Sequence, residues 1–555
     1  MTYTPYGEVT SETDENDHTT RYDYDGVGNI KKVQNALDRI VRYEYDGNGN
    51  MTAKFINDKK ATYAYDANDH MTVEKDEYDK KNEYQYDVDG NLLKHTKPDG
   101  TTLTYTYDKL GNKLSEGKRS FTYDKHNNLS TATLNNKTVS YTYDKFNQIT
   151  KVKDANGNVV SYTWDIYGNK TSMNYKNTKI NYQYNDMHKI TKVSKGSKEV
   201  ATYSYDARGN ITKQTNGKLS TTYTYDELNR KLSAVTTRNK KQTAKYEYTY
   251  DGTGNILTET INGKKNSYTY DAMDELTKSI KYIKGKEVTT TYAYDLNGNK
   301  VEISSNGKFK RYHYNKYNQL TSIFTEEGST DIYYDKNGNM RDVLYAGGGK
   351  EHYDYDEYGQ LSKVTNDKDK SYTYSYDAQG DRIRYQKNYS EAYDNDTWYE
   401  SLEQTSFEEV EELLDDKNSD QIIESVRYQS NYRKTHHKCV LMKEENWDSD
   451  GDDWENKNIA YILDKSLENA EVLATSTGEI NIYGQDERLS TDSKTNDGIN
   501  KTVNYVNGNN NSVYGLATTE NAWGDIRYKY KAIEYTDYGY SDDIKSGFGY
   551  NGEEH

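Results

Sequence analysis

Paired tyrosines followed by an aspartate are the residues of this sequence with the clearest capacity for chemistry. The unit reads Tyr-x-Tyr-Asp, and its copies mostly follow one another at steps of about 20 or 21 residues, a period typical of repeat proteins. It stands at Tyr22–Asp25, Tyr43–Asp46, Tyr63–Asp66, Tyr84–Asp87, Tyr105–Asp108, Tyr353–Asp356 and Tyr374–Asp377.

The tyrosine pairs suggest two roles. Aromatic faces stack on pyranose rings and phenol hydroxyls bond to sugar hydroxyls, so the pairs could form a carbohydrate-binding platform. Alternatively, rings of successive units pack together across strands and form a structural ladder. We favour the ladder, because a residue that every unit needs to hold its sheet together has little freedom to bind a ligand.

The repeated aspartate also has two interpretations. A carboxylate at each unit could coordinate calcium, or it could accept backbone N–H bonds in the turn that follows the tyrosines. Calcium needs several oxygen ligands converging on one point, and one aspartate per unit does not supply them. We therefore expect the aspartates to cap turns.

A denser acidic cluster lies outside the repeats, at Asp448-Ser449-Asp450-Gly451-Asp452-Asp453. Its alternating carboxylates resemble a calcium loop. However, Gly451 stands at the fourth place of the loop rather than the sixth, and Ile459 stands at the twelfth, where a bidentate acid is expected. We favour a plain acidic loop.

The segment His436-His437-Lys438-Cys439 is the only other cluster with potential metal ligands or a nucleophile. Neither CxxC nor HExxH spacing is present, and neighbouring histidines point in different directions. No GxSxG or phosphate-binding Gly-Lys-Ser/Thr loop occurs either. The sequence therefore assigns no catalytic, cofactor-binding or metal-ligating residue, and we expect a protein that is not an enzyme.

The elements that must position the tyrosines are strands. Tyr22 and Tyr24 are two residues apart and so face the same side of an extended strand. Asp25 ends that strand, Gly28-Asn29 supplies residues that tolerate positive φ, and Ile30 starts a returning strand. Each unit is thus predicted to be a strand, a tight turn and a strand. Longer steps before Tyr250 and Tyr294 predict lengthened hairpin loops.

The repeat pattern divides the chain into three parts. Residues 1–390 form the repeat array, and residues 459–555 return to β character, as at Tyr461–Asp464. Between them, 391–458 is acidic and non-repetitive, and a capping box at Ser406 and Glu409 predicts a helix there. We therefore expect an all-β fold in which tandem hairpins continue one long antiparallel sheet, with a small, partly helical insertion.

Composition limits the classes of function. The chain has 555 residues and a net charge of −17, with acidic and basic residues interspersed, which argues against nucleic acid as a partner. Its 61 tyrosines supply the apolar area that its few aliphatic residues do not. Cys439 is the only cysteine, so no internal disulfide is possible, and no apolar run is long enough for a membrane span.

Residues 1–390 resemble the YD-repeat (Rhs) family of bacterial surface and secreted proteins, whose hallmark is Tyr-x-Tyr-Asp-x-x-Gly-Asn. The C-terminal part resembles the stretch leading into that family's core region, as in wall-associated members from Gram-positive bacteria. The stretches that carry this second resemblance are Glu468–Leu473, Tyr483–Leu489, Tyr514–Thr518 and Phe548–Glu554.

The resemblance implies a sheet that spirals into a shell around a polymorphic C-terminal toxin. The expected partners are that effector domain, outside the present chain, and its immunity protein; the expected location is secreted or on the cell surface or cell wall of a bacterium. The alternative function is a cell-surface adhesin that binds carbohydrate through its tyrosine-rich surface.

Both ends of the sequence lead us to expect a piece of a longer protein. Met1–Gly7 resembles the middle of a unit, and no signal peptide begins the chain. The chain stops at His555, where the family continues into its self-cleavage motif, so the resemblance assigns neither autoproteolysis nor toxicity to any residue here.

Overall fold

The computed structural model describes residues 1–388, apart from 57–58, 77–78, 284 and 368–369, together with strands between 458 and 532. Every regular element in these residues is a β-strand. The prediction of an all-β fold is therefore confirmed for the described chain, whereas the predicted helix at 391–458, the acidic cluster 448–453 and His436–Cys439 lie outside it. The three-part division of the chain stays a prediction.

The first half of the sheet consists of β1 (Thr2–Tyr3), β2 (Val9–Thr13), β3 (Thr19–Tyr24), β4 (Ile30–Gln34), β5 (Ile40–Tyr45), β6 (Met51–Ile56), β7 (Lys59–Tyr65), β8 (Met71–Lys75), β9 (Lys81–Tyr86), β10 (Leu92–Thr96), β11 (Thr102–Tyr107), β12 (Lys113–Glu116), β13 (Arg119–Tyr123), β14 (Leu129–Leu134), β15 (Lys137–Tyr143), β16 (Ile149–Lys153), β17 (Val159–Trp164), β18 (Lys170–Tyr175), β19 (Thr178–Tyr184), β20 (Ile190–Lys195), β21 (Lys198–Tyr205), β22 (Ile211–Asn216) and β23 (Leu219–Tyr225). The second half consists of β24 (Lys231–Arg238), β25 (Lys241–Tyr250), β26 (Ile256–Ile261), β27 (Lys264–Tyr270), β28 (Leu276–Ile283), β29 (Lys286–Tyr294), β30 (Lys300–Ser305), β31 (Lys308–Tyr314), β32 (Leu320–Thr325), β33 (Gly328–Tyr334), β34 (Met340–Leu344), β35 (Lys350–Tyr355), β36 (Leu361–Asn366), β37 (Ser371–Tyr376) and β38 (Arg382–Asn388). The strands of the C-terminal part are β39 (Asn458–Asp464), β40 (Glu471–Thr475), β41 (Ile480–Tyr483), β42 (Arg488–Lys494), β43 (Asn500–Asn507), β44 (Val513–Ala522) and β45 (Asp525–Ala532).

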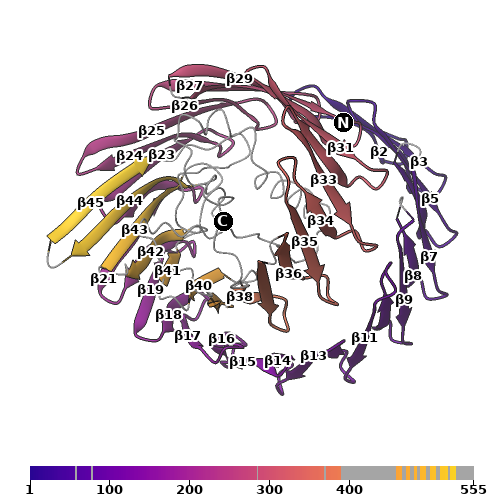
Figure 1. The fold of residues 1–555 in the computed structure, drawn as a ribbon, viewed down its shortest axis with the longest axis horizontal. Coiled ribbons are helices and arrows are strands. Elements are labelled where there is room, and N and C mark those ends of the chain that lie inside the picture. Colours follow the sequence, from indigo (N-terminus) through magenta and orange to yellow (C-terminus); the bar gives the residue numbers. More distant parts are fainter. Residues whose placement is uncertain are drawn as a thin grey trace.

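Each strand pairs antiparallel with the next one along the chain, and the sheet never closes on itself. Because antiparallel strands twist and coil, a sheet of this length curls. Figure 1 shows the result: β1 to β9 lie on one side of a ring, β11 to β25 continue around it, and β33 to β38 pass inside the N-terminal strands. The predicted spiral is confirmed.

Antiparallel order places the turns on two rims. The turns after odd-numbered strands follow Tyr-x-Tyr-Asp, and we call their edge the YD rim; residues 25–29 and 251–255 are examples. The turns after even-numbered strands form the opposite edge, the return rim, exemplified by residues 14–18 and 35–39.

The repeat forms a hairpin because its two strands match residue by residue. In many units the first tyrosine lies opposite an apolar residue of the returning strand, as Tyr141 lies opposite Val152 and Tyr182 opposite Val193. These side chains are buried, and Val193 is fully so. A β-bulge then precedes the second tyrosine in nearly every unit, for example between Thr142 and Tyr143, and leads the chain into the turn.

The YD turn shows the predicted capping and corrects one detail. In the first complete unit, Asp25 accepts backbone N–H bonds of 2.9 Å from Val27 and Asn29, and Gly28 has φ of 94°. Asn29 does not have positive φ; its amide instead donates to the second oxygen of Asp25 at 3.0 Å. In this unit glycine thus supplies the positive φ of the turn, and asparagine supplies a side-chain donor to the aspartate.

The two longer units differ from the prediction. The extra residues lengthen strands rather than loops: β25 spans 10 residues and β29 spans 9, and the bend before β25 consists of Asn239 and Lys240 alone. Extra strand residues extend the ladder and keep backbone groups paired, which a longer loop would not do.

The chain returns to the sheet where it left it. β39 pairs with β38, with Arg384 opposite Ala460, although about 70 residues separate the two strands in sequence. The predicted return of β structure at Tyr461–Asp464 is thus confirmed, and the spiral continues into the C-terminal strands.

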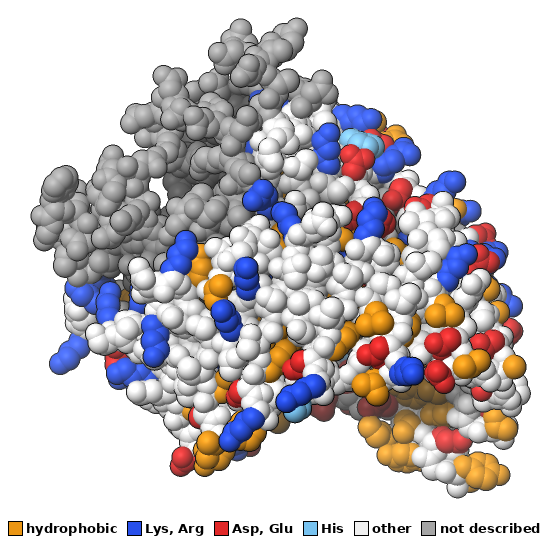
Figure 2. Space-filling model, turned by 90° about the horizontal axis from the view of Figure 1, so that it is seen from below, with side chains coloured by type: hydrophobic (Ala, Val, Ile, Leu, Met, Phe, Trp, Pro, Cys, Tyr) orange, Lys and Arg blue, Asp and Glu red, His pale blue; other side chains and the backbone are white. Residues whose placement is uncertain are grey.

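The side view shows how charge is distributed on one face of the wall. Lysine and arginine are scattered among aspartate and glutamate, and hydrophobic side chains gather toward the lower edge (Figure 2). This face therefore carries no single-sign stripe of the kind that binds nucleic acid.

Candidate functional site: the joints of the wall

The tyrosine hydroxyls join each unit to the one before it. The second tyrosine donates to the backbone carbonyl that begins the preceding returning strand, at 2.5–3.0 Å. The pairs are Tyr24–Val9, Tyr45–Ile30, Tyr65–Met51, Tyr123–Lys113, Tyr143–Leu129, Tyr184–Lys170, Tyr205–Ile190, Tyr225–Ile211, Tyr250–Lys231, Tyr270–Ile256, Tyr294–Leu276, Tyr314–Lys300, Tyr334–Leu320 and Tyr376–Leu361.

One unit has another residue in place of the second tyrosine, and this residue also links its strand to the preceding one. Trp164 stands where the other units have tyrosine, and its indole N–H donates 2.7 Å to the carbonyl of Ile149. The position therefore requires a ring with a donor at its far end, which phenylalanine lacks. The tyrosines thus link neighbouring strands through their hydroxyls, and the predicted ladder of stacked rings stays a prediction.

Removal of one hydroxyl tests this link. We expect Tyr184→Phe to lower the free energy of unfolding by about 0.5–1.5 kcal/mol, because the carbonyl of Lys170 loses its donor while the ring remains. Urea titration followed by circular dichroism measures the change. Tyr333→Phe is the matched control, since Tyr333 is 45 % exposed on its strand. Equal effects of both variants would contradict the assigned role.

Neighbouring YD turns are also linked along their rim. The asparagine that closes one turn donates to the residue at the bend of the next, as Asn210 does to Asn229 at 3.0 Å and Asn255 to Asp274 at 2.6 Å. The backbone N–H of Asn29 is the main cause that lowers the pKa of Asp25 in its turn. The carboxylates of these turns are thus bound to the turn itself. No group of three or more potential metal-ligating side chains occurs in the part of the chain that the structure describes.

A third set of contacts joins successive turns of the spiral. Residues 235 to 260 positions apart in sequence bond to one another, mostly between the return rim of the first spiral turn and the YD rim of the second. We call these contacts the inter-turn seam. They connect the bend after β2 to that after β25, and the bend after β12 to that after β35, so one spiral turn takes about 23 strands.

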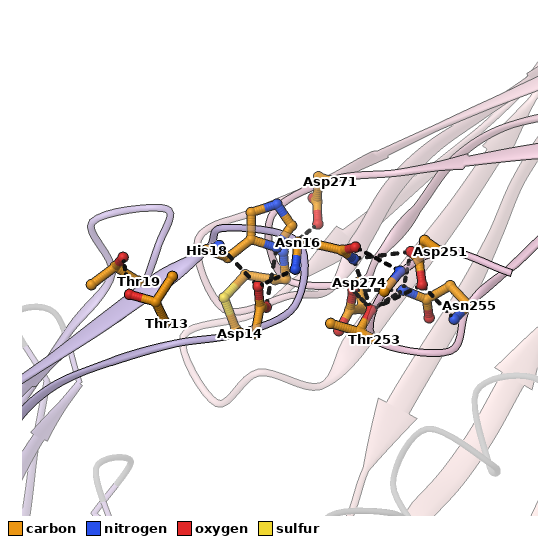
Figure 3. Close-up of polar contacts among 12 residues, drawn as sticks. Thr13, Asp14, Asn16, His18, Thr19, Asp251, Thr253, Asn255, Asp271 and Asp274 are labelled. Carbon is orange, nitrogen blue, oxygen red and sulfur yellow. Dashed lines mark hydrogen bonds and ion pairs between the residues drawn. The ribbon is translucent and has the colours of Figure 1, made fainter. Parts of the chain in front are cut away.

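Asn16 makes the first contact of the seam, which Figure 3 shows. Its amide donates 3.0 Å to Asp251 and 2.8 Å to Thr253, and its oxygen accepts the N–H of Gly252 at 3.0 Å. The approach is close: a Cβ on Gly252 would lie 2.4 Å from the backbone oxygen of Glu15. Glycine is therefore required there for space.

Charged and polar pairs continue the seam. Arg39 forms a bidentate pair with Glu275, with bonds of 3.1 and 3.0 Å, and both side chains are only 16 % exposed. Further along, Asn337 and Asp99 exchange two bonds of 3.0 and 2.7 Å. Partly buried, bidentate geometry makes such a pair stronger than an ordinary surface ion pair.

Tyr358 is the aromatic contact of the seam. Its hydroxyl accepts the N–H of Lys118 at 2.9 Å and donates to the carbonyl of Glu116 at 3.0 Å. The guanidinium of Arg119 stacks 3.5 Å from its ring centre, and Arg119 also bonds to Gln360 at 2.8 Å. Burial raises the pKa of Tyr358 to about 12.

Lys465 joins the C-terminal part to the repeat array. It is buried and lies 2.5 Å from Asp377, with Asp381 as a second ion partner and Gln379 as a hydrogen-bond acceptor at 3.2 Å. Gln379 in turn accepts the hydroxyl of Tyr141 from the first spiral turn. Burial opposes the charge on Lys465, but the two carboxylates raise its pKa above the ordinary value.

One open pocket of 430 Å³ lies at the seam, between the return-rim residues Asp99 and Thr101 and β35. Its lining includes His352, but His352 is bound to Asp342 at 2.8 Å. Asp342 also pairs with Arg341 and Lys350, and although burial opposes this, these partners lower its pKa to about 2. A carboxylate held ionised in this way is a structural counter-ion and a poor general acid.

Sequence reasoning found the tyrosines and the turn aspartates but missed the seam and Lys465. The seam residues Asn16, Gly252 and Tyr358 follow no spacing of their own, since their partners lie a full spiral turn away. No local signal marks them, because an aromatic residue or a second glycine also occurs in YD turns that make no contact with another spiral turn, as at Tyr167 and Gly26.

Comparison with known proteins agrees with this geometry. The family model for the Teneurin YD-shell matches residues 55–194 and 249–394, and that for the RHS repeat matches 24–54 and 205–242. No curated protein sequence matches the chain. No helix in the described residues has the length and apolar character needed to cross a membrane.

Two crystal structures have a similar fold. TcdB2-TccC3-TEV matches at 13% identity with a TM-score of 0.57, over 97% of this chain and 32% of its own. TcdB2-TccC3 matches at 13% identity with a TM-score of 0.52, over 100% of this chain and 34% of its own. The chain thus spans about a third of the length of these proteins. With half of its residues matched by one family model and its strands arranged in the same spiral, the chain belongs to the Teneurin YD-shell family and carries RHS repeats.

Proposed function

We propose that this chain is the wall of a shell that encloses or presents a C-terminal effector of a longer bacterial protein. The shell would be secreted or exposed at the cell surface and would serve competition between bacteria, with the effector's immunity protein as a further partner. The chain's own role is structural and not enzymatic.

The inter-turn seam is the observation that carries this proposal. A sheet that only coiled would leave a helical slit between its turns. Here the slit is bridged by hydrogen bonds, by the Arg39–Glu275 pair and by the insertion of Tyr358. Continuous strand pairing along the wall and bonds between its turns are what a container needs to exclude proteases and hold a cargo.

The carbohydrate-binding alternative gains less support. In the repeated units the hydroxyl of the second tyrosine donates to a backbone carbonyl, and first tyrosines such as Tyr162 and Tyr248 are buried, each 3 % exposed. A sugar would have to displace these contacts. We expect a glycan array probed with this chain to stay blank, and saturable binding that Tyr162→Ala weakens would favour the adhesin.

A seam variant tests containment in the full-length gene product. We expect the C-terminal domain to resist protease in the intact protein and to be digested when produced alone. Gly252→Ala should make it accessible, because the added methyl collides with the backbone of Glu15 and opens the seam.

Gly26→Ala is the matched control for that experiment. Gly26 follows its aspartate as Gly252 does, has no positive φ and has nothing within 4 Å of its added Cβ. It should leave protection unchanged. Digestion of the C-terminal domain at equal rates in the intact protein and in isolation would refute containment, and equal effects of the two glycine variants would refute the role of the seam.

A further inference from the structure

The turn between β37 and β38 differs from many other YD turns at its last residue. In those turns an asparagine amide binds the second oxygen of the aspartate, as Asn29 binds Asp25 at 3.0 Å. Here Asp381 stands in place of the asparagine, so no amide covers Oδ2 of Asp377. This oxygen is buried, yet it accepts no hydrogen bond from the residues that the structure describes.

The amine of Lys465 is the group beside this oxygen. Its Nζ lies 2.5 Å from Oδ2 of Asp377, and Asp381 is its second ionic partner. The side chain of Lys465 is 4 % exposed and that of Asp377 has no exposed surface, whereas that of Asp381 is 35 % exposed. An amine and a carboxyl group are thus held in contact away from solvent, with a second carboxylate touching the amine.

Apolar residues of the first spiral turn pack against this YD turn. Ala378, which follows Asp377 in sequence, belongs to a buried cluster that includes Phe121, Ala132 and Leu134. Two reacting groups fixed in contact behave as though their concentration were on the order of 10⁵–10⁸ M. The site therefore favours a condensation between the two groups, and its burial protects the product from hydrolysis.

The other oxygen of Asp377 is held as such a reaction requires. Oδ1 accepts the backbone N–H of Gln379 at 2.9 Å and that of Asp381 at 3.1 Å. Two fixed donors stabilise the negative charge that develops on a carbonyl oxygen when a nucleophile adds to its carbon. Burial also raises the pKa of Asp377, which favours the neutral carboxyl group that an amine can attack.

We propose that Lys465 and Asp377 form an isopeptide bond, an amide between their side chains. The bond between Nζ and Cγ of Asp377 forms, the bond between Cγ and Oδ2 breaks, and Oδ2 leaves as water with two protons of the ammonium group. An ammonium and a carboxylate thus give an amide and a water, with no other reactant. The ion pair is the state from which the bond forms.

Asp381 has the role of proton carrier in this step. Burial opposes the charge on Lys465, but the two carboxylates raise its pKa, so the amine must give up a proton before it can attack. Asp381 contacts Nζ and accepts that proton, then returns it to the departing oxygen. Asp381 is therefore a catalytic residue of the proposed reaction, and Asp377 is the residue that is modified.

The bond would fasten the C-terminal part to the repeat array. The pairing between β38 and β39 extends over three residues of each strand, from Arg384 to Gln386 and from Asn458 to Ala460. An amide from 377 to 465 closes a ring that contains residues 378–464. A single cut within that ring would leave the two parts of the wall covalently joined, which an ion pair cannot achieve.

Mass spectrometry of the purified, denatured 555-residue chain tests the proposal. We expect the intact mass to fall short of the sequence mass by one water. Trypsin should release Ser371–Arg382 linked to Asn458–Arg488, because a modified Lys465 is not cleaved. Fragmentation of this product should place the link on Asp377. Full mass after prolonged incubation of the folded chain, or a link on Asp381, would overturn the proposal.

An exposed ion pair of similar length is the internal control. Lys118 lies 2.7 Å from Glu357, but its side chain is 69 % exposed. Water solvates its ammonium group, and we expect tryptic peptides from this pair to remain unlinked. A link there as well would show that proximity alone, without the buried site, accounts for the modification.

Two variants separate the amine from the proton carrier. Lys465→Arg keeps a positive charge but has no amine that can attack, and it should show the full mass. Asp381→Asn should slow linkage by about 10²–10⁴-fold, measured as the linked fraction with time after synthesis. Unchanged circular dichroism shows that each variant is folded. A mass deficit of one water in Lys465→Arg would overturn the bond, and an unchanged rate in Asp381→Asn would overturn the role of Asp381.

Discussion

Replacing Lys465 by methionine is expected to lower the free energy of unfolding at neutral pH by about 3–5 kcal/mol. Lys465 is 4 % exposed and Asp377 is not exposed, so the variant leaves a buried carboxylate, with Asp381 close by, without its cation. Guanidinium titration followed by circular dichroism measures the loss. Lys336→Met, in a YD turn where Lys336 is exposed, should change stability by a few tenths of that amount at most.

The pH dependence of the Lys465 variant identifies the cause. Burial already raises the pKa of Asp377 in the native protein, and loss of Lys465, which opposes this, should raise it further. A carboxyl whose folded pKa is raised stabilises the fold below its unfolded pKa and loses that contribution as pH rises through the folded value. The variant should therefore regain stability toward pH 4, and Asp377→Asn should rescue it at pH 7. A deficit that is the same at all pH values would mean lost packing and not an unpaired charge.

The position of Lys465 explains why the loss of this single side chain should reduce stability so strongly. It follows β39, which pairs with β38 after about 70 intervening residues, and it binds the turn that also meets Tyr141 of the first spiral turn. Three parts of the chain thus meet at one buried ion cluster. Its loss should loosen the C-terminal strands before the repeat array, which proteolysis of the variant would reveal.

Local parts of this fold could be predicted from the sequence because their causes are local. Alternation at Tyr22 and Tyr24, the acceptor of Asp25 and the positive φ of Gly28 all act within one hairpin. The extra residues before Tyr250 were predicted to lengthen a loop, but they lengthen β25. A longer distance between two repeats does not show whether the strand or the bend contains the extra residues. The alternation of residues and the turn residues were enough to predict the hairpin of one unit, and the repetition of that unit was enough to predict the sheet.

The seam and the ion cluster could not be predicted in this way. Which residues meet after a spiral turn depends on the summed twist and coil of about 23 strands, and a small change in each would move the partner of Asn16 by a whole unit. Lys465 lies in no repeat, and a buried lysine has no sequence signature apart from its partners. The seam and the ion cluster both depend on contacts between residues that are far apart in the sequence. Arg39 and Glu275, for example, are 236 residues apart.

The whole wall is expected to unfold cooperatively in alkali, between about pH 10 and pH 12. Burial raises the pKa of Tyr184, Tyr225 and Tyr250 to about 12, and the aspartate of the preceding YD turn adds to the shift in each case. Burial raises the pKa of Tyr334 as well. An unfolded phenol ionises near pH 10, so the folded chain holds more protons in this interval, and stability falls as pH rises.

The repeat makes this fall steep. Each half-buried tyrosine contributes on the order of 1–2 kcal/mol by pH 12, after allowance for its partial exposure. Ionisation also removes the donor that holds the preceding strand's carbonyl, and it places a phenolate near a carboxylate, as Tyr184 would be near Asp165. Tyrosinate absorbance and circular dichroism should therefore change together, with more than one proton released per molecule. Tyr184→Trp should retain the link, as Trp164 does with an indole that does not titrate here, and should make the transition less steep. A gradual titration with the strands intact at pH 12 would mean that the hydroxyls do not hold the wall together.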